Sequence, residues 1–164
     1  MSVAAKEETA DAPGGRVALI TGASRGIGAA VARQLDGAGW SLSLGMRNSQ
    51  APDGFRGDVH FAKHDAVDAD EDAWVSAAIA HHGRIDAVIC CAGVMVPRSV
   101  IAIGDGDLDH MWEVNVKSPR RLIAAAWPEL CRSGSGRVVI AASLSGKRVN
   151  PPYSRGPAVT RCGV

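Results

Sequence analysis

The stretch Thr21-Gly22-Ala23-Ser24-Arg25-Gly26-Ile27-Gly28 decides the fold of this chain, because a strand pattern precedes it and a helix pattern follows it. Residues 16–21 read RVALIT, a continuous apolar and β-branched run that is typical of a strand buried on both faces. Residues 26–36 carry apolar side chains near helical spacing, namely Ile27, Ala30, Val31 and Leu35. A glycine-rich turn between a strand and a helix predicts a phosphate-binding loop.

The rest of the chain repeats this alternation of strand and helix patterns. Further strands are expected at residues 40–46, 59–63, 85–91 and 137–142, and further helices at residues 70–82 and over most of residues 107–131. The helix at 70–82 is expected to place Trp74, Ala77 and Ala78 on one side. This order predicts a doubly wound, Rossmann-like parallel α/β sheet of about five strands, incomplete because the C-terminal strands are missing.

One domain with two short ends is predicted. Residues 1–14 lack the apolar core of a signal peptide, so we expect a flexible tail and a cytoplasmic protein. Residues 15–148 form the predicted dinucleotide-binding domain. Residues 149–164 contain three prolines and no periodicity, which predicts an irregular C-terminal segment.

The composition of the 164 residues argues against several other classes of protein. Apolar residues make up 46% and charged residues 21%, which is ordinary for a globular chain. A formal net charge of +1 gives no field to attract nucleic acid or a membrane surface, and no apolar run could span a bilayer. The histidines have no zinc spacing with the four cysteines, so no metal site is predicted.

The physical case for cofactor binding rests on the backbone of the loop. Glycines let the chain turn tightly and leave no Cβ between the backbone and a pyrophosphate. The start of the following helix presents N–H groups and a positive dipole end to an anion. The candidate cofactor-binding residues of this loop are Thr21, Gly22, Ser24, Arg25, Gly26, Ile27 and Gly28.

Basic residues around the loop favour NADP over NAD. An NAD site places a carboxylate at the end of the second strand, where it binds the ribose diol. Here Met46 stands near that position and Arg47 follows it, while Arg25 lies inside the loop. Two guanidinium groups can bind a 2′-phosphate with bidentate hydrogen bonds. The alternative is that both arginines are solvated surface residues.

The spacing T-G-x-x-x-G-x-G resembles the short-chain dehydrogenase/reductase family, and further motifs follow in the family's order over about residues 15–148. The resemblance implies that Asp65 contacts adenine and that Ala92 and Gly93, in C-A-G, border the cofactor. It implies hydride transfer between nicotinamide and a small carbonyl or alcohol substrate. The implied catalytic residues are Asn115 in DHMWEVNV, Ser143 in RVVIAASLSG and Tyr153 in YSRGPAV.

The catalytic end of the chain departs from the family pattern. In the family the tyrosine exchanges a proton with the substrate oxygen, the serine orients that oxygen and the asparagine holds a water. A lysine four residues after the tyrosine lowers its pKa, which otherwise lies near 10. Here Pro157 stands at that position. Three alternatives follow: an NADP-dependent oxidoreductase impaired at this end, a non-catalytic NADP-binding module, or an inactive fragment.

The family likeness decays near residues 149–150, as a frameshift or an early stop in the coding sequence would produce, and we state this as a hypothesis. If no strand follows residues 137–142, this apolar strand lies at the edge of the sheet. Unpaired backbone groups on an apolar edge invite pairing with another chain. The sequence therefore predicts self-association, with a homo-oligomer as one form of it.

Overall fold

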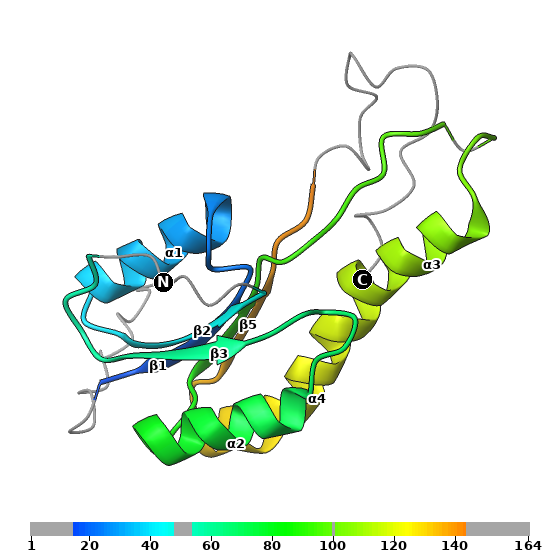
Figure 1. Cartoon of the computed structure of the whole chain (residues 1–164). Coiled ribbons are helices and arrows are strands. Elements are labelled where there is room, and N and C mark those ends of the chain that lie inside the picture. Colours follow the sequence, from blue (N-terminus) through cyan, green and yellow to red (C-terminus); the bar gives the residue numbers. More distant parts are fainter. Residues whose placement is uncertain (1–14, 48–53, 100, 144–164) are drawn as a thin grey trace, which may run out of the picture.

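The computed structural model describes residues 15–47, 54–99 and 101–143, which form a parallel sheet flanked by helices (Figure 1). Its strands are β1 (Val17–Thr21), β2 (Ser41–Met46), β3 (Val59–Lys63), β4 (Ala87–Cys90) and β5 (Arg137–Ile140). Its helices are α1 (Gly26–Gly37), α2 (Glu71–His82), α3 (Asp105–Trp112), the π-helical turn η1 (Glu113–Lys117) and α4 (Ser118–Arg132). The predicted Rossmann-like α/β fold is thereby confirmed.

The strands lie in the order β3-β2-β1-β4-β5, and every neighbouring pair is parallel. The chain therefore builds outward from β1 through β2 to β3, then crosses back and continues through β4 to β5 on the other side. Thr21, the last residue of β1, pairs with Gly45 of β2 and with Cys90 of β4. In such sheets a ligand binds beyond the carboxyl ends of the strands where the winding direction changes, which here is the end of β1.

Two apolar layers cover the two faces of the sheet. Helix α1 lies on one side, and α2 and α4 lie on the other (Figure 1). Alternate residues of β1 feed the two layers: Ala18 and Ile20 join the α1 side, whereas Leu19 joins the α2–α4 side. Continuous apolar strands are the expected consequence of a sheet that is covered on both faces.

A tryptophan explains the glycine within β2. The indole of Trp74 in α2 is 4% exposed, and its Nε1–H donates to Ser43 Oγ at 2.8 Å. A Cβ built on Gly45 would lie 2.5 Å from the indole Cη2 atom. Gly45 therefore makes room for the ring that seats α2 on the sheet.

The predicted buried face of α1 is only partly right. Ile27 is 66% exposed and Ala30 is exposed, while the buried residues are Gly28, Ala29, Ala32 and Asp36. Val31 and Leu35 pack at the border of the core. The helix turns its smallest residues toward the sheet because its first turn must approach the end of β1 closely. In α2, similarly, Ala77 is exposed and Val75 is buried.

The helical region after β4 begins at Asp105, earlier than predicted, and contains Pro119 and Pro128 without a break. Helices α3, η1 and α4 follow one another directly as a single rod (Figure 1). Pro119 lies in the first turn of α4, a position that tolerates proline because the backbone N–H there has no partner within α4 itself. Pro128 lies inside the helix. The fourth and fifth strands are shorter than predicted, ending at Cys90 and Ile140.

Some predictions fall outside the described residues. These are the N-terminal tail, the irregular C-terminal segment, and Tyr153 with Pro157 inside that segment. None of the helices in the described part of the chain is long and apolar enough to cross a bilayer.

Candidate functional site

The loop after β1 is wedged between the ends of two strands. The N–H of Gly22 donates to the carbonyl of Gly45 at 3.1 Å, and the N–H of Ala23 reaches the same oxygen at 3.4 Å. Gly22 has φ +68°, and a Cβ built on it would lie 2.7 Å from the backbone nitrogen of Ala92. Only glycine fits this position, since both the backbone angle and the neighbouring chain exclude a side chain.

The start of α1 approaches the same loop equally closely. A Cβ built on Gly28 would lie 2.3 Å from the carbonyl oxygen of Gly22. Gly26, with φ +60°, is different, because a Cβ there would meet no atom of the described residues within 4 Å. Gly28 therefore allows tight packing, whereas Gly26 leaves open space at the helix start.

The N-terminus of α1 has the properties of an anion site. Arg25 is the N-cap residue, and among the described residues no side-chain hydrogen bond caps the helix. The first turn holds no acidic residue. Ser24 and Arg25 are exposed beside it. Backbone N–H groups and the positive dipole end therefore face open space, and the residues present fit a phosphate group.

Thr21 connects the loop to the segment after β4. Its side chain is buried, and Oγ1 accepts hydrogen bonds from the N–H groups of Cys91 and Ala92, both at 3.1 Å. The threonine hydroxyl thus holds Ala92 and the following Gly93 beside the loop. Within the candidate site its role is one of positioning.

The carboxyl ends of β2 and β3 bring two further candidates to the same edge of the sheet. Met46 is buried at the end of β2, and the following Arg47 is exposed. Asp65 is the second residue after β3, and its Oδ1 accepts from the N–H of Val67 at 3.2 Å. Because neighbouring parallel strands end at one edge, Arg47 and Asp65 lie on the edge that carries the loop.

Asn115 lies in η1 and uses its side chain on the backbone. Its Oδ1 accepts from the N–H of Val94 at 2.9 Å, and its Nδ2 donates to the carbonyl of Val94 at 2.9 Å. The side chain therefore holds the chain just beyond Gly93. The family resemblance implied a water-holding asparagine, and sequence alone did not predict this pair of hydrogen bonds to the backbone of Val94.

Of the other two catalytic candidates, Ser143 lies among the described residues and Tyr153 does not. Ser143 lies three residues beyond β5 and is half-buried. The N–H of Ala141 donates to the carbonyl of Cys90 at 2.9 Å, so the pairing of β5 with β4 continues almost to Ser143. Ser143 thus follows the same carboxyl edge as Ala92 and Gly93. Tyr153 lies outside the described residues and is not placed beside it.

An ion pair between the half-buried Arg121 and the buried Glu71, which the sequence did not predict, holds the segment that carries this edge. Arg121 of α4 donates from Nε to both carboxylate oxygens of Glu71 at 3.2 Å and from Nη2 to the carbonyl of Ala66 at 2.9 Å. Glu71 is only 5% exposed. The pair fixes α2, α4 and the loop that carries Asp65. No local pattern predicts it, because Glu71 and Arg121 are far apart in the sequence.

The cysteine beside the site is structural. Cys90 is 2% exposed at the end of β4, and burial, followed by the neighbouring Cys91, raises its pKa to about 12. A thiol with this pKa stays protonated at neutral pH and packs as a small apolar side chain.

Comparison with known proteins identifies the family. The family model for short chain dehydrogenase matches residues 16–155. The chain belongs to the short-chain dehydrogenase family. Its members are oxidoreductases that use NAD or NADP, and the described part of this chain has a five-stranded parallel sheet with a glycine-rich loop after its first strand.

Relatives and solved structures agree with this assignment. The chain is 40% identical over 147 residues to agropine synthesis reductase of Rhizobium rhizogenes, covering 84% of this chain and 33% of that protein. It resembles the alcohol dehydrogenase of Thermococcus sibiricus complexed with 5-hydroxy-NADP, with a TM-score of 0.73, 28% identity and coverage of 83% and 61% of the two chains.

A second solved structure carries the other nicotinamide cofactor. The 3-oxoacyl-[acyl-carrier protein] reductase of Brucella melitensis in complex with NAD aligns with a TM-score of 0.73 and 27% identity, covering 83% of this chain and 58% of that one. This chain therefore spans a third of one curated relative and about three fifths of these two solved chains.

Proposed function

We propose that this chain binds NADP at the loop between β1 and α1 and serves an oxidoreductase that acts on a small carbonyl or alcohol. The observation that carries the proposal is the open N-terminus of α1. Gly26 leaves space there, the first turn holds no acid, and no side chain of the described residues caps the helix. A pyrophosphate at this position would accept hydrogen bonds from the backbone of the first turn.

The choice of NADP rests on the charges beside this position. Arg25 precedes α1 and Arg47 follows β2, and both are exposed at the edge where the loop lies. The end of β2 carries the neutral Met46 where an NAD site has a carboxylate. A 2′-phosphate would meet two guanidinium groups and no opposing acid at these positions.

The remaining candidates have roles that follow from their positions in the described structure or, for Tyr153, from the family resemblance alone. Bound NADP would supply the hydride at its nicotinamide ring. Thr21 and Asn115 hold the segment from Cys91 to Val94, so Ala92 and Gly93 are kept at the sheet edge. Ser143 would orient the substrate oxygen there, and Tyr153 would exchange a proton with it.

A fluorescence titration with NADPH and NADH tests the cofactor assignment. We expect Arg25→Ala and Arg47→Ala each to weaken NADPH binding about tenfold, since a hydrogen bond to a charged group contributes about 1.5–3 kcal/mol. NADH binding should stay nearly unchanged in both variants. Arg33→Ala, which removes an exposed arginine from the outer part of α1, is the matched control. Equal binding of NADH and NADPH by the unaltered chain would contradict the assignment.

A non-catalytic NADP-binding module is the second candidate function. Pro157 favours it, because the family's lysine at that position makes the tyrosine an effective acid and base near neutral pH. A carbonyl-reduction assay with NADPH separates the candidates. Turnover that Tyr153→Phe abolishes supports the oxidoreductase, binding without turnover supports the module, and absence of both indicates an inactive fragment.

A further inference from the structure

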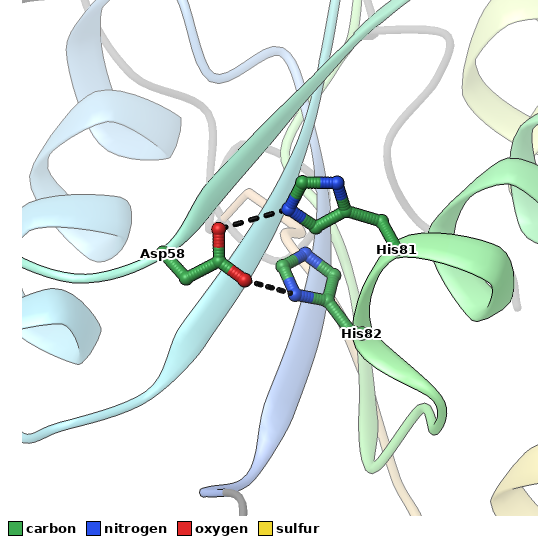
Figure 2. Close-up of side chains that lie close together, drawn as sticks. All are labelled: Asp58, His81 and His82. Atoms are coloured by element: carbon green, nitrogen blue, oxygen red, sulfur yellow. Dashed lines mark hydrogen bonds and ion pairs between the residues drawn. The ribbon is translucent and has the colours of Figure 1, made fainter.

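Two histidines and an aspartate meet away from the cofactor edge of the sheet. His81 and His82 form the last residues of α2, and Asp58 directly precedes β3 (Figure 2). His81 Nε2 lies 2.8 Å from Asp58 Oδ1, and His82 Nδ1 lies 3.1 Å from Asp58 Oδ2. One ligand atom of each residue lies within 4.8 Å of those of the other two. Asp58 precedes β3, whereas the proposed cofactor site lies beyond the strands' carboxyl ends, so the cluster belongs to the opposite edge.

The backbone orients His82 so that a single nitrogen is left for a ligand. His82 Nε2 lies 3.1 Å from the carbonyl oxygen of Leu42, and a carbonyl can only accept, so Nε2 carries a proton. In the neutral ring the lone pair is then on Nδ1, the atom that faces Asp58. A histidine whose second nitrogen donates to a backbone carbonyl is the usual arrangement of a metal ligand.

Strand β2, which provides the Leu42 carbonyl to His82, also holds Asp58. The N–H of Leu42 donates to the carbonyl of Asp58 at 3.0 Å, so Leu42 contacts both Asp58 and His82. The two residues that precede Asp58 are held as well: the N–H groups of Arg56 and Gly57 donate to the Asp36 carboxylate of α1 at 2.9 and 2.8 Å. The segment that presents Asp58 is therefore fixed from two sides before any ion arrives.

Three ligand atoms converge here: His82 Nδ1, His81 Nε2 and a carboxylate oxygen of Asp58. A cation placed among them would accept lone pairs from both imidazoles and from the carboxylate. The end of α2 adds the negative end of the helix dipole, which also favours a cation.

We propose that Asp58, His81 and His82 form a binding site for a divalent transition-metal ion of the zinc class. Two imidazoles and one carboxylate suit Zn²⁺ better than Mg²⁺ or Ca²⁺, which prefer oxygen ligands. Bonds of about 2.0–2.2 Å place tetrahedral ligand atoms about 3.3–3.6 Å apart, so the two contacts with Asp58 must open by about 0.2–0.8 Å. The two imidazole nitrogens already lie within 4.8 Å of each other.

Exposure leaves the ion a route in and a fourth position for water. The side chain of His82 is 1% exposed, whereas those of His81 and Asp58 are 41% and 56% exposed. His60 is the neighbouring titratable group: its ring centroid lies 5.4 Å from that of His81, and its Nδ1 bonds to Ser43 Oγ at 2.8 Å. The bound ion would connect the start of β3 to the end of α2.

Zinc binding to the full chain without a histidine tag tests the proposal. Isothermal titration with ZnCl₂ should give one tight site per chain, and Asp58→Asn, His81→Gln and His82→Gln should each weaken it at least about tenfold. His110→Gln, which removes an exposed histidine of α3, should leave the affinity unchanged. Zinc should also raise the melting temperature of the unaltered chain and not that of His81→Gln.

Two further measurements test whether each variant is folded and which side chains bind the metal. Circular dichroism verifies that each variant is folded; His81→Gln, at an exposed side chain, serves if His82→Gln unfolds. Co²⁺ in place of zinc should give the strong visible bands of a four-coordinate site without sulfur-to-metal charge-transfer absorption, which excludes binding at the cysteines. Absence of tight zinc binding, or affinity that His81→Gln leaves unchanged, would overturn the site.

Discussion

Single residues connect parts of this molecule that the sequence separates widely. Asp86 is 1% exposed between α2 and β4 and accepts from the N–H of Val17 at 2.9 Å and from Ser133 Oγ at 2.8 Å. Arg84 donates to both of its oxygens, at 2.8 and 2.6 Å. One carboxylate therefore joins the start of β1, the approach to β4 and the end of α4. Thr21 likewise joins the glycine-rich loop to the segment after β4, because its hydroxyl accepts hydrogen bonds from the N–H groups of Cys91 and Ala92.

The network at Asp86 predicts a pH-dependent stability. Burial acts to raise the pKa of Asp86, but the hydrogen bonds from Arg84, Val17 and Ser133 outweigh it and hold the pKa below its ordinary value. A carboxyl with a lower pKa in the folded state stabilises the fold above its unfolded pKa, near 3.9, and loses this contribution as the pH falls through the folded pKa. The free energy of unfolding should therefore decrease as the pH falls below about 4.

Urea unfolding of Asp86→Asn measures this contribution. We expect a loss of about 2–3 kcal/mol at pH 7, because hydrogen bonds to a buried charge are lost, and a smaller difference from the unaltered chain below about pH 4. Asp109→Asn, at an exposed position of α3, should change stability by less than about 0.5 kcal/mol. Equal effects of the two substitutions at pH 7 would refute the role given to Asp86.

At the scale of elements, helices are seated by close contacts between small residues and their neighbours. Helix α1 reaches the loop because Gly28 has no side chain to meet the carbonyl of Gly22. Helix α2 lies over β2 because Gly45 leaves room for Trp74, whose indole also bonds to Ser43. The packing of both helices thus depends on the absence of a Cβ at one position.

A Cβ at Gly45 should destabilise the domain. Gly45→Ala would force a buried indole to move, and overpacking of this kind costs about 1–3 kcal/mol. The urea midpoint should fall while the slope of the transition stays the same. Gly37→Ala, where a Cβ meets no atom of the described residues within 4 Å, is the control and should be neutral or slightly stabilising. A Gly45→Ala chain as stable as the control would show that Trp74 relaxes without cost.

On the scale of the whole molecule, the two outer strands of the described sheet differ in character. β3 carries His60 and Lys63, and its start lies beside the proposed metal site. β5 pairs with β4 alone among the described strands, and its Val138, Val139 and Ile140 are 40%, 51% and 37% exposed. Charged side chains protect an edge from pairing with other chains, and apolar ones do not.

If no further strand pairs with β5, we predict self-association of this chain through β5. Sedimentation velocity over a range of concentrations should show dimers or larger species, and Val139→Lys should shift the distribution toward the monomer. Phe61→Lys, at an exposed position of β3, controls for the added charge and should have little effect. A monodisperse monomer at high concentration, or an equal response to both substitutions, would count against β5 as the interface.

The sequence by itself determined the class of fold, the order of strands and helices along the chain, and the place of the glycine-rich loop. These follow from local patterns: apolar strand runs, helical spacing, and glycines at Gly22 and Gly28. The local pattern failed at Ile27, whose apolar side chain is exposed because the close approach of Gly28 to Gly22 sets the rotation of α1.

Only the tertiary structure decided which distant residues meet. Asn115 reaches Val94, Arg121 reaches Glu71, and Asp58 reaches His81 and His82, although no spacing along the chain relates these partners. The spacing of histidines relative to cysteines carries no information on Asp58, which a separate segment places beside His81 and His82. Periodicity reports which face of an element is buried; contacts between elements depend on sheet order and register, which bring the ends of separate segments together.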